Sequence, residues 1–395
     1  MAGPTPVSAL IHAATMVTAG VFLMARMSPV IEYAPVTLAI VTIVGAATAF
    51  FAATVGCVQN DIKRVIAYST CSQLGYMFFA AGVGVYQAAI FHLFTHAFFK
   101  ALLFLGAGSV IHAMSDEQDI RKMGGIWRKI PITYAVMWVG SLALAGIPFF
   151  AGYYSKDMVL EVAFAAHSGP GSFAFAMGLI AAFLTAFYSW RLLILTFHGA
   201  PRADRHTMEH VHESPAVMLV PLLVLAVGAA VAGYLFYPLF VGEFQEAFWN
   251  GSIHNAAHNE VLENAHHLPA WVPLAPTVAG VAGIALAYVM YMFAPGIPAQ
   301  LVARFNGLYR FLLNKWYFDD LYDAIFVRPT LYLARAFWKT GDARIIDGVP
   351  NGAAALAVDV ARGAVRIQTG RVANYAFTMI IGLVIFVSLL LYGAR

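Results

Sequence analysis

Charged residues are scarce in this chain. Of its 395 residues, 11% are Asp, Glu, Lys or Arg and 61% are hydrophobic. Soluble domains carry about 25% charged residues, so this sequence cannot cover a water-exposed surface. The sequence has two cysteines, Cys57 and Cys71. They form no Cys-x-x-Cys pair, which argues against a metal site or a disulfide framework and favours small apolar packing residues.

Blocks of basic residues are also missing. The formal net charge is +3, and the basic residues are dispersed between apolar runs, so we expect no binding of nucleic acid. The first six residues contain no Lys or Arg, so we expect no secretory signal peptide. The composition therefore predicts a protein of the lipid bilayer.

The apolar runs have the length of membrane spans. A helix needs about 20 apolar residues to cross the hydrocarbon core. We therefore predict an all-α, polytopic membrane protein with about nine transmembrane helices. The predicted spans are 7–26, 34–56, 65–85, 88–112, 133–165, 173–197, 215–240, 271–293 and 372–392.

Basic residues alternate between the two sides of this arrangement. Loops after the even-numbered spans are basic, as with Lys63, Arg121 and Arg202, whereas the other side has Arg26 and the terminal Arg395. Basic loops stay in the cytoplasm. We therefore predict residue 1 on the cytoplasmic side and the C-terminus on the periplasmic side of a bacterial inner membrane. Lys63 is interpreted as an orientation signal, with proton uptake as the alternative.

The segment 319–371 is too long for a loop and too charged to cross the membrane. Pro329 and Pro350 suit the first turns of two helices. Basic residues at i,i+4 spacing alternate with leucines, which predicts an amphipathic stretch along the membrane surface. A soluble helical linker is the alternative. We divide the chain into a helix bundle (1–297), an amphipathic lateral helix segment (298–371) and a final anchor (372–395).

Lys100 is the most informative residue because it lies in the middle of the span 88–112. At about 1.5 Å per residue it is about 18 Å from either end. A charge at that depth costs at least about 2.5–3.5 kcal/mol and is mostly functional. His92 and His96 precede it at i,i+4 spacing on one helix face. The row predicts a proton relay, although a lone buried histidine is more often a satisfied core residue.

The span 133–165 predicts a broken helix. It is too long for one straight crossing, and its middle reads Gly146-Ile-Pro-Phe-Phe-Ala-Gly152. Proline interrupts a helix, and broken helices at membrane depth line cavities in transporters. Lys156 and Asp157 follow directly, so we place a second site here. A long tilted helix with a snorkelling Lys156 is the alternative.

Three weaker features remain. His12 lies inside the first span, where a structural role is favoured. Ser69 and Gln73 make the third span polar, which favours packing through hydrogen bonds between helices over lining of water. His254 and His258 have the spacing of metal ligands, but their loop is irregular and we predict no metal site.

Four segments resemble the antiporter-like subunits of respiratory complex I, NADH:quinone oxidoreductase. They resemble the start of the eighth transmembrane helix of that family, a later helix start, its central lysine helix and its second broken helix. The segments read Ala2-Gly-Pro-Thr-Pro-Val-Ser-Ala-Leu-Ile-His12, Asp61-Ile-Lys-Arg-Val-Ile-Ala-Tyr-Ser-Thr-Cys-Ser-Gln-Leu-Gly-Tyr76, Phe91-His-Leu-Phe-Thr-His-Ala-Phe-Phe-Lys100 and Gly146-Ile-Pro-Phe-Phe-Ala-Gly-Tyr-Tyr-Ser-Lys-Asp157. Complex I subunits L, M and N, multisubunit cation/proton antiporters and membrane hydrogenases share these motifs.

Two more segments resemble the L type, the mitochondrial chain 5, in particular. They read Asp116-Glu-Gln-Asp-Ile-Arg-Lys-Met-Gly-Gly125 and Asn314-Lys-Trp-Tyr-Phe-Asp-Asp-Leu-Tyr-Asp323. The resemblance covers essentially the whole chain. It implies that 319–371 is the lateral helix that ties neighbouring membrane-arm subunits together, especially the M-type neighbour.

The resemblance also implies a role for each site residue. Lys100 would be the central membrane lysine, with His92 and His96 as relay neighbours. His12 would belong to the same axis, and Lys156 with Asp157 would form the exit-side group.

The family further implies an enzyme that works as a complex. The chain would be a subunit of a proton-translocating NADH:quinone oxidoreductase, and flavin, iron–sulfur clusters and quinone would belong to other subunits. We therefore expect no cofactor in this chain. Members carry several helices before the position of Met1, so we expect an N-terminally truncated form that does not pump alone. The alternatives are a subunit of a cation/proton antiporter and a purely structural brace.

Overall fold

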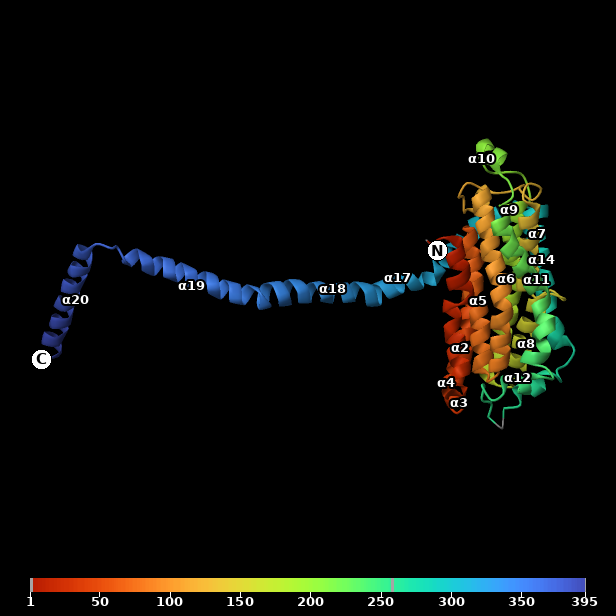
Figure 1. The fold of residues 1–395 in the computed structure, drawn as a ribbon, viewed down its shortest axis with the longest axis horizontal. Coiled ribbons are helices and arrows are strands. Elements are labelled where there is room, and N and C mark those ends of the chain that lie inside the picture. Colours follow the sequence, from red (N-terminus) through yellow and green to blue (C-terminus); the bar gives the residue numbers. More distant parts are fainter. Residues whose placement is uncertain (1–2, 257–258, 395) are drawn as a thin grey trace. The chain divides into compact units, whose positions relative to one another are not determined.

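The computed structural model describes residues 3–256 and 259–394. The predicted positions at His258 and Arg395, and Ala2, the first residue of the opening motif, lie outside them. By its internal contacts the chain divides into two units, Met1–Trp316 and Tyr317–Arg395 (Figure 1). The functional division into 1–297, 298–371 and 372–395 stays a prediction.

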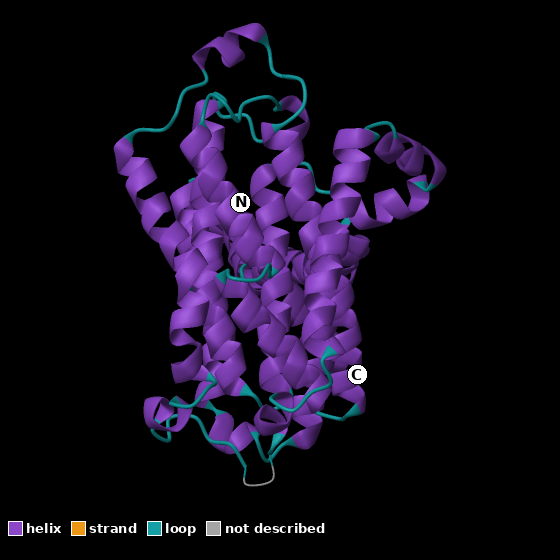
Figure 2. Cartoon of the chain, turned by 90° about the vertical axis from the view of Figure 1, so that its right-hand side faces the viewer, coloured by secondary structure: helices purple, strands orange, loops and turns teal. Residues whose placement is uncertain are grey.

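Unit 1 is a bundle of upright helices with loops at both ends (Figure 2). Apart from an isolated bridge between Asp61 and Asp119, its described regular elements are all helical. The longer ones are α4 (Pro35–Gly56), α5 (Ile62–Gly82), α6 (Tyr86–Ala113), α7 (Pro131–Ala145), α8 (Ala151–Ala165), α9 (Gly169–Phe197), α11 (Ala216–Phe240) and α14 (Trp271–Tyr288). The shorter ones are α3 (Ser28–Ile31), η3 (Ile120–Lys122), α10 (Arg205–His210), α12 (Gln245–Trp249), α13 (Val261–Ala265), η4 (Val289–Phe293), α15 (Ile297–Arg304) and α16 (Asn306–Leu313).

The predicted all-α, multi-pass fold is confirmed. Among the described residues, seven helices are long and apolar enough to cross a membrane. The two other predicted spans correspond to α5, which is rich in polar residues, and to the interrupted pair α7 and α8. Apart from Glu32, the buried ionisable side chains of the described residues lie on α5, α6, α8 and α9.

Close packing of α4 on α5 explains the small residues in both helices. A Cβ atom on Gly75 would lie 2.6 Å from the carbonyl oxygen of Gly45 and 2.6 Å from the amide nitrogen of Ala49. The Ser72 hydroxyl donates to the Ala49 carbonyl across the same interface at 2.8 Å. Small residues and interhelical hydrogen bonds of this kind hold helices together in a bilayer.

The first span differs from the straight helix that its length predicts. It consists of α1 (Thr5–Val7), a π-helix η1 (Ser8–Ala14), a 3₁₀ turn η2 (Met16–Thr18) and α2 (Ala19–Arg26). The Thr15 hydroxyl donates to the Leu10 carbonyl at 2.8 Å, and the Thr18 hydroxyl donates to the Thr15 carbonyl at 2.7 Å. Such local hydrogen bonds compete with the α-helical ladder and bend helices. The sequence predicts one interrupted span, 133–165, and the interruption of the first span was not predicted.

Unit 2 is helical from Phe318 to Ile367, apart from a turn at Asp347. Its elements are α17 (Phe318–Tyr322), η6 (Asp323–Val327), α18 (Arg328–Ala336), η7 (Phe337–Ile346), α19 (Gly348–Ile367) and, after a break, α20 (Val372–Gly393); a short turn η5 (Lys315–Tyr317) precedes them. Pro329 lies in the first turn of α18, as predicted. Pro350 lies near the start of α19, but α-helical and π-helical stretches join the two predicted helices into one long segment.

Candidate functional site

Lys100 lies at the middle of α6 with its side chain fully buried. Its Nζ donates a hydrogen bond to the Ser69 hydroxyl of α5. Among the described residues, the recorded ion pairs all lie outside this site and none involves Lys100. A hydroxyl is a neutral partner. It therefore does not offset the free-energy cost of burying the charge of the Lys100 ammonium.

The two histidines of the predicted row lie beside each other on α6. The ring centroids of His92 and His96 are 6.1 Å apart, and both side chains are fully buried. Neither ring nitrogen of His96 has a hydrogen-bond partner among the described residues. An unsatisfied buried polar group costs about 1–3 kcal/mol, so its presence at this point calls for a functional reason.

His92 is connected to two other helices. Its Nδ1 lies 3.0 Å from the Ser155 hydroxyl of α8, and its Nε2 lies 2.9 Å from Oε1 of Gln73 on α5. The Thr95 hydroxyl lies 2.6 Å from the same Ser155 hydroxyl. The residue after Ser155 is Lys156. The His92 imidazole of α6 is therefore connected, through the Ser155 hydroxyl, to the helix that carries the second predicted site.

The predicted break in the fifth span lies where the sequence places it. The helix α7 ends at Ala145, Gly146 adopts a left-handed conformation with φ of 76°, and α8 begins at Ala151. Lys156 Nζ donates to the Ala145 carbonyl at 2.5 Å. Carbonyls at the C-terminus of a helix carry partial negative charge and attract a cation. The break therefore creates a buried seat for the Lys156 ammonium.

Asp157 lies next to this seat. Its side chain is 4% exposed, and neither carboxylate oxygen has a hydrogen-bond partner among the described residues. A Cβ atom on Gly146 would lie 2.6 Å from Lys156 Nζ and 3.4 Å from Asp157 Oδ1. Because glycine has no Cβ atom, Gly146 leaves room for both the Lys156 ammonium and the Asp157 carboxylate.

His12 lies on the π-helix η1, beside α6. Its ring contacts Phe104 edge to face, with centroids 5.8 Å apart, and its buried Nε2 has no partner among the described residues. Phe104 is one helical turn beyond Lys100. The structure thus brings all six predicted site residues into one bundle, with the α6 row and the α7–α8 break linked through Ser155.

Two residues of this network were not predicted. Ser155 and Thr95 have no conspicuous sequence signal, although Ser155 precedes Lys156 and Thr95 lies one turn from His92. Ser69 and Gln73 were noticed as polar residues of the third span, and here they bind Lys100 and His92.

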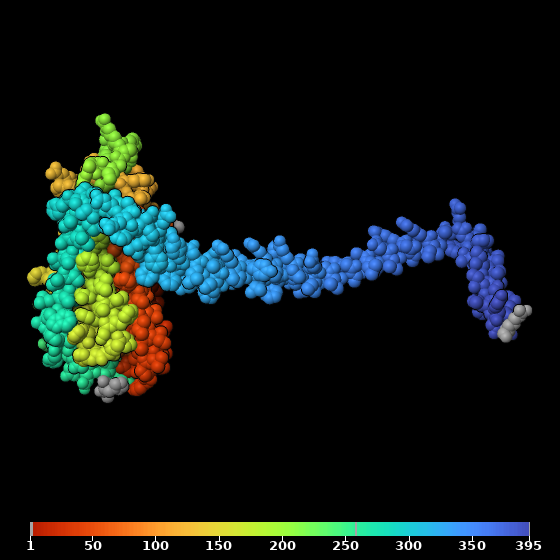
Figure 3. All heavy atoms as spheres, turned by 180° about the vertical axis from the view of Figure 1, so that it is seen from behind, coloured from red at the N-terminus to blue at the C-terminus, as the bar shows by residue number. Residues whose placement is uncertain are grey.

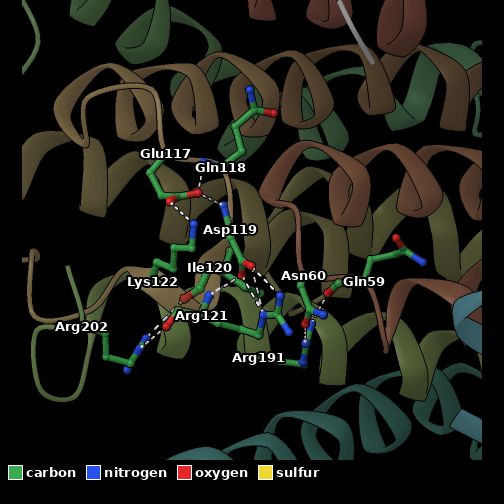
Figure 4. A network of polar contacts seen from close by, with 10 residues as sticks. All are labelled: Gln59, Asn60, Glu117, Gln118, Asp119, Ile120, Arg121, Lys122, Arg191 and Arg202. Carbon is green, nitrogen blue, oxygen red and sulfur yellow. Dashed lines mark hydrogen bonds and ion pairs between the residues drawn. The ribbon is translucent and has the colours of Figure 1, made fainter. Parts of the chain in front are cut away.

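The loop after α6 forms a separate polar cluster (Figure 4), at the end of the bundle where Figure 1 shows α10. Arg121 donates to both carboxylate oxygens of Asp119, and its Nη2 lies 2.6 Å from Oδ2. The hydrogen bond from Arg121 holds the pKa of Asp119 below its usual value, and burial opposes this only in part. Burial raises the pKa of Glu117. The backbone amides of residues 118 and 119 and the Lys122 ammonium lower it by more, so the net pKa lies below its usual value. The L-type motif 116–125 is therefore a charge-paired loop.

The opposite end is fastened through Glu32. Its carboxylate is 7% exposed and accepts hydrogen bonds from Tyr86 at 2.8 Å and from Asn259 at 2.6 Å. His254 hydrogen-bonds the Tyr33 hydroxyl at 3.0 Å. These contacts hold the loop between α11 and α14 against the turn before α4.

These observations define a class: a polytopic α-helical membrane protein with buried ionisable groups beside a broken helix, an architecture typical of transporters. Residues 1–185 match the family model described as NADH:quinone oxidoreductase/Mrp antiporter, transmembrane. Residues 1–185 of the chain are thus similar to the transmembrane domain of this family.

The similarity extends over almost the whole chain. It is 50% identical to NADH-quinone oxidoreductase subunit L of Rhodobacter capsulatus over 97% of this chain and 63% of that protein. It is 47% identical to NADH-ubiquinone oxidoreductase chain 5 of Marchantia polymorpha over 99% of this chain and 59% of that protein. The chain thus spans about three-fifths of the length of these relatives.

A solved structure shares the fold. The chain superposes on a chain of the Mrp complex from a Dietzia species with a TM-score of 0.62 and 26% identity. The match covers 100% of this chain and 38% of that one.

Proposed function

We propose that the chain serves as a membrane-arm subunit of a proton-translocating NADH:quinone oxidoreductase in a bacterial inner membrane, with residue 1 on the cytoplasmic side. The observation that carries the proposal is the buried row Lys100, His96 and His92, which meets the broken helix at Ser155. The 50% identity to an L subunit also supports the proposal.

The row has the chemistry of a proton relay. Each neutral imidazole can accept a proton at one ring nitrogen and release one from the other. The Ser155 hydroxyl both donates and accepts, so it can pass a proton between His92 and the Lys156 region. Charging Lys100 inside the bundle is costly, so nearby charges and hydration decide when it holds a proton.

The broken helix would form the exit side of the relay. The Ala145 carbonyl stabilises the Lys156 ammonium, and the unpaired carboxylate of Asp157 can receive a proton from it. His12 would belong to the same axis through its position beside Phe104. Electron transfer through flavin, iron–sulfur clusters and quinone would take place in other subunits, which drive the relay from outside this chain.

The lateral segment would hold the neighbouring subunits. Leu331 on α18 and Leu356 on α19 are 49% and 66% exposed within the chain, which is typical of a helix that contacts lipid or a partner. We propose that 319–371 lies along the membrane surface and contacts other membrane-arm subunits, especially an M-type neighbour.

A second candidate is a subunit of a multisubunit cation/proton antiporter. The observation that favours it is the TM-score of 0.62 to a chain of an Mrp complex. The two candidates differ in their energy source, because one couples protons to NADH oxidation and the other to a cation gradient.

Inverted membrane vesicles from the source bacterium separate the two candidates. The pH inside the vesicles is followed after addition of NADH or after a Na⁺ pulse, with and without the gene for this chain. We expect NADH-driven acidification that is lost when the gene is absent and returns when an unaltered copy of the gene is restored. A pH change that follows Na⁺ and ignores NADH would instead identify the antiporter.

A further inference from the structure

We infer that unit 1 contains a binding site for an anionic glycerophospholipid, separate from the proton relay. The site is a cavity of about 860 Å³ between the ends of α4 and α9, the π-helix η4 and the short helices α15 and α16. In Figure 3 the cyan segment that contains α15 and α16 lies across the yellow-green surface of the bundle. The inference rests on the proposed orientation of the chain and is independent of the proposed proton relay.

The lining of the cavity is apolar over most of its surface. Large side chains from α9, α15 and α16 face it, including Phe187, Val302, Phe305, Leu308 and Leu312. Pockets of about 300–1,000 Å³ with such linings hold ligands of drug size. Acyl chains fit this lining because they require contact area and no hydrogen bonds.

One end of the cavity carries a buried positive charge. Arg191 of α9 is 6% exposed and lines the cavity. Within the described part of the chain it donates three hydrogen bonds, all to neutral acceptors: the Gln59 carbonyl at 2.5 Å, the Asn60 side chain at 2.7 Å and the Tyr291 hydroxyl at 3.1 Å. A guanidinium has five N–H donors, so two remain for a ligand.

A second guanidinium lies at the rim of the same cavity. Arg202 donates to the backbone carbonyls of Ile120 and Arg121 (Figure 4) and of Leu195, and these are again neutral acceptors. The third cationic residue of the lining, Arg121, is paired with Asp119. The recorded ion pairs of the described residues include none for Arg191 or Arg202.

The position selects a lipid over a soluble anion. Arg191 lies six residues before the end of α9, at the level where apolar spans give way to the basic loops. Phospholipid headgroups occupy this level, and basic pockets between transmembrane helices on the cytoplasmic side bind anionic headgroups. A phosphate would take the free donors of Arg191 in the planar geometry that guanidinium groups favour, while its acyl chains fill the apolar part.

Native mass spectrometry of the full chain in a neutral detergent tests the inference. The delipidated protein is mixed with equal amounts of phosphatidylglycerol and phosphatidylcholine, and separately with inorganic phosphate. We expect preferential retention of phosphatidylglycerol. Equal retention of the two lipids, or phosphate binding that matches the lipid, would overturn the inference.

Variants assign the preference to the cavity. Arg202→Gln is expected to reduce the preference about fivefold, and Arg191→Gln to abolish it. Arg205→Gln is the matched control, because Arg205 lies nearby, is exposed and pairs with Glu209. Ala299→Trp fills the cavity and should exclude the lipid, whereas Val278→Trp places the same bulk on an exposed face. Unchanged binding in Arg202→Gln and Ala299→Trp would contradict the site.

Discussion

The Ser155 hydroxyl lies 3.0 Å from Nδ1 of His92 and joins the central lysine helix to the broken helix. Thr95 approaches the same hydroxyl at 2.6 Å, so Ser155 is shared by two groups of α6. A hydroxyl at this junction can orient the imidazole and pass a proton onward. Ser155 thus connects the row on α6 to α8, the helix that carries Lys156 and Asp157.

Removal of this hydroxyl is expected to weaken proton transfer and leave electron transfer largely intact. Ser155→Ala leaves His92 Nδ1 without its partner, which costs about 1–3 kcal/mol. A change of that size in the barrier slows the step by about 5- to 150-fold. Proton translocation and NADH oxidation are measured together in membrane vesicles.

Thr42→Val is the matched control for Ser155→Ala. Thr42 is equally buried, but among the described residues its hydroxyl donates to the Leu38 carbonyl of its own helix, at 2.8 Å, and to no other helix. If Ser155→Ala and Thr42→Val have the same effect on translocation, the junction has no special role.

Gly146→Ala is expected to damage the seat of Lys156. The new Cβ would lie 2.6 Å from Lys156 Nζ, and the left-handed backbone adds about 1–2 kcal/mol of strain. Both thermal stability and proton translocation should fall. Gly251→Ala separates the two causes, because Gly251 has a φ of 75° with no atom near its Cβ position. Equal losses of translocation in both variants would refute the steric explanation.

Asp157→Asn is expected to separate stability from function. The carboxylate is buried without a hydrogen-bond partner among the described residues, so the neutral amide should leave the free energy of unfolding unchanged or raise it by about 1 kcal/mol. Proton release should slow because an amide does not accept a proton from Lys156. Thermal unfolding and vesicle acidification give the two readouts. A less stable variant that still pumps normally would reverse this interpretation.

The pH dependence of stability is expected to involve Asp119. The Arg121 hydrogen bond lowers the pKa of Asp119 in the folded protein. Its stabilising contribution is therefore complete above the unfolded pKa of about 3.9 and is lost as pH falls through the lower folded pKa. Asp119→Asn should cost about 0.5–1 kcal/mol at pH 7, because Arg121 is 62% exposed and the pair is screened.

The comparison is made by thermal unfolding across pH. The difference between Asp119→Asn and the unaltered chain should close at acidic pH. Asp359→Asn should show no difference at any pH, since Asp359 and Arg362 are 72% and 76% exposed and 3.5 Å apart. A cost of Asp119→Asn that persists at the lowest pH would point to packing instead of charge.

Much of this arrangement follows from local sequence. The depth of Lys100 and the common face of His92 and His96 follow from helical periodicity. The break after Ala145 follows from Gly146 and Pro148, because one tolerates a left-handed backbone and the other cannot continue a helix.

Contacts between distant segments could not be predicted in this way. Ser155 meets His92 across 63 residues, and Arg191 meets Asn60 across 131 residues. Serine and arginine are polar wherever they occur, so their partners depend on how the helices pack. The bend at Thr15 was also missed, because a threonine hydroxyl that bonds to its own helix leaves no trace in the apolar pattern.

The central claim is that Lys100 carries translocated protons, and the number of protons moved per NADH oxidised tests it most directly. Lys100→Ala in the assembled complex is compared with Lys129→Ala, which removes an exposed lysine outside the spans. We predict fewer protons per NADH for Lys100→Ala and an unchanged number for Lys129→Ala. The unaltered proton number in Lys100→Ala, with normal NADH oxidation, would contradict the account.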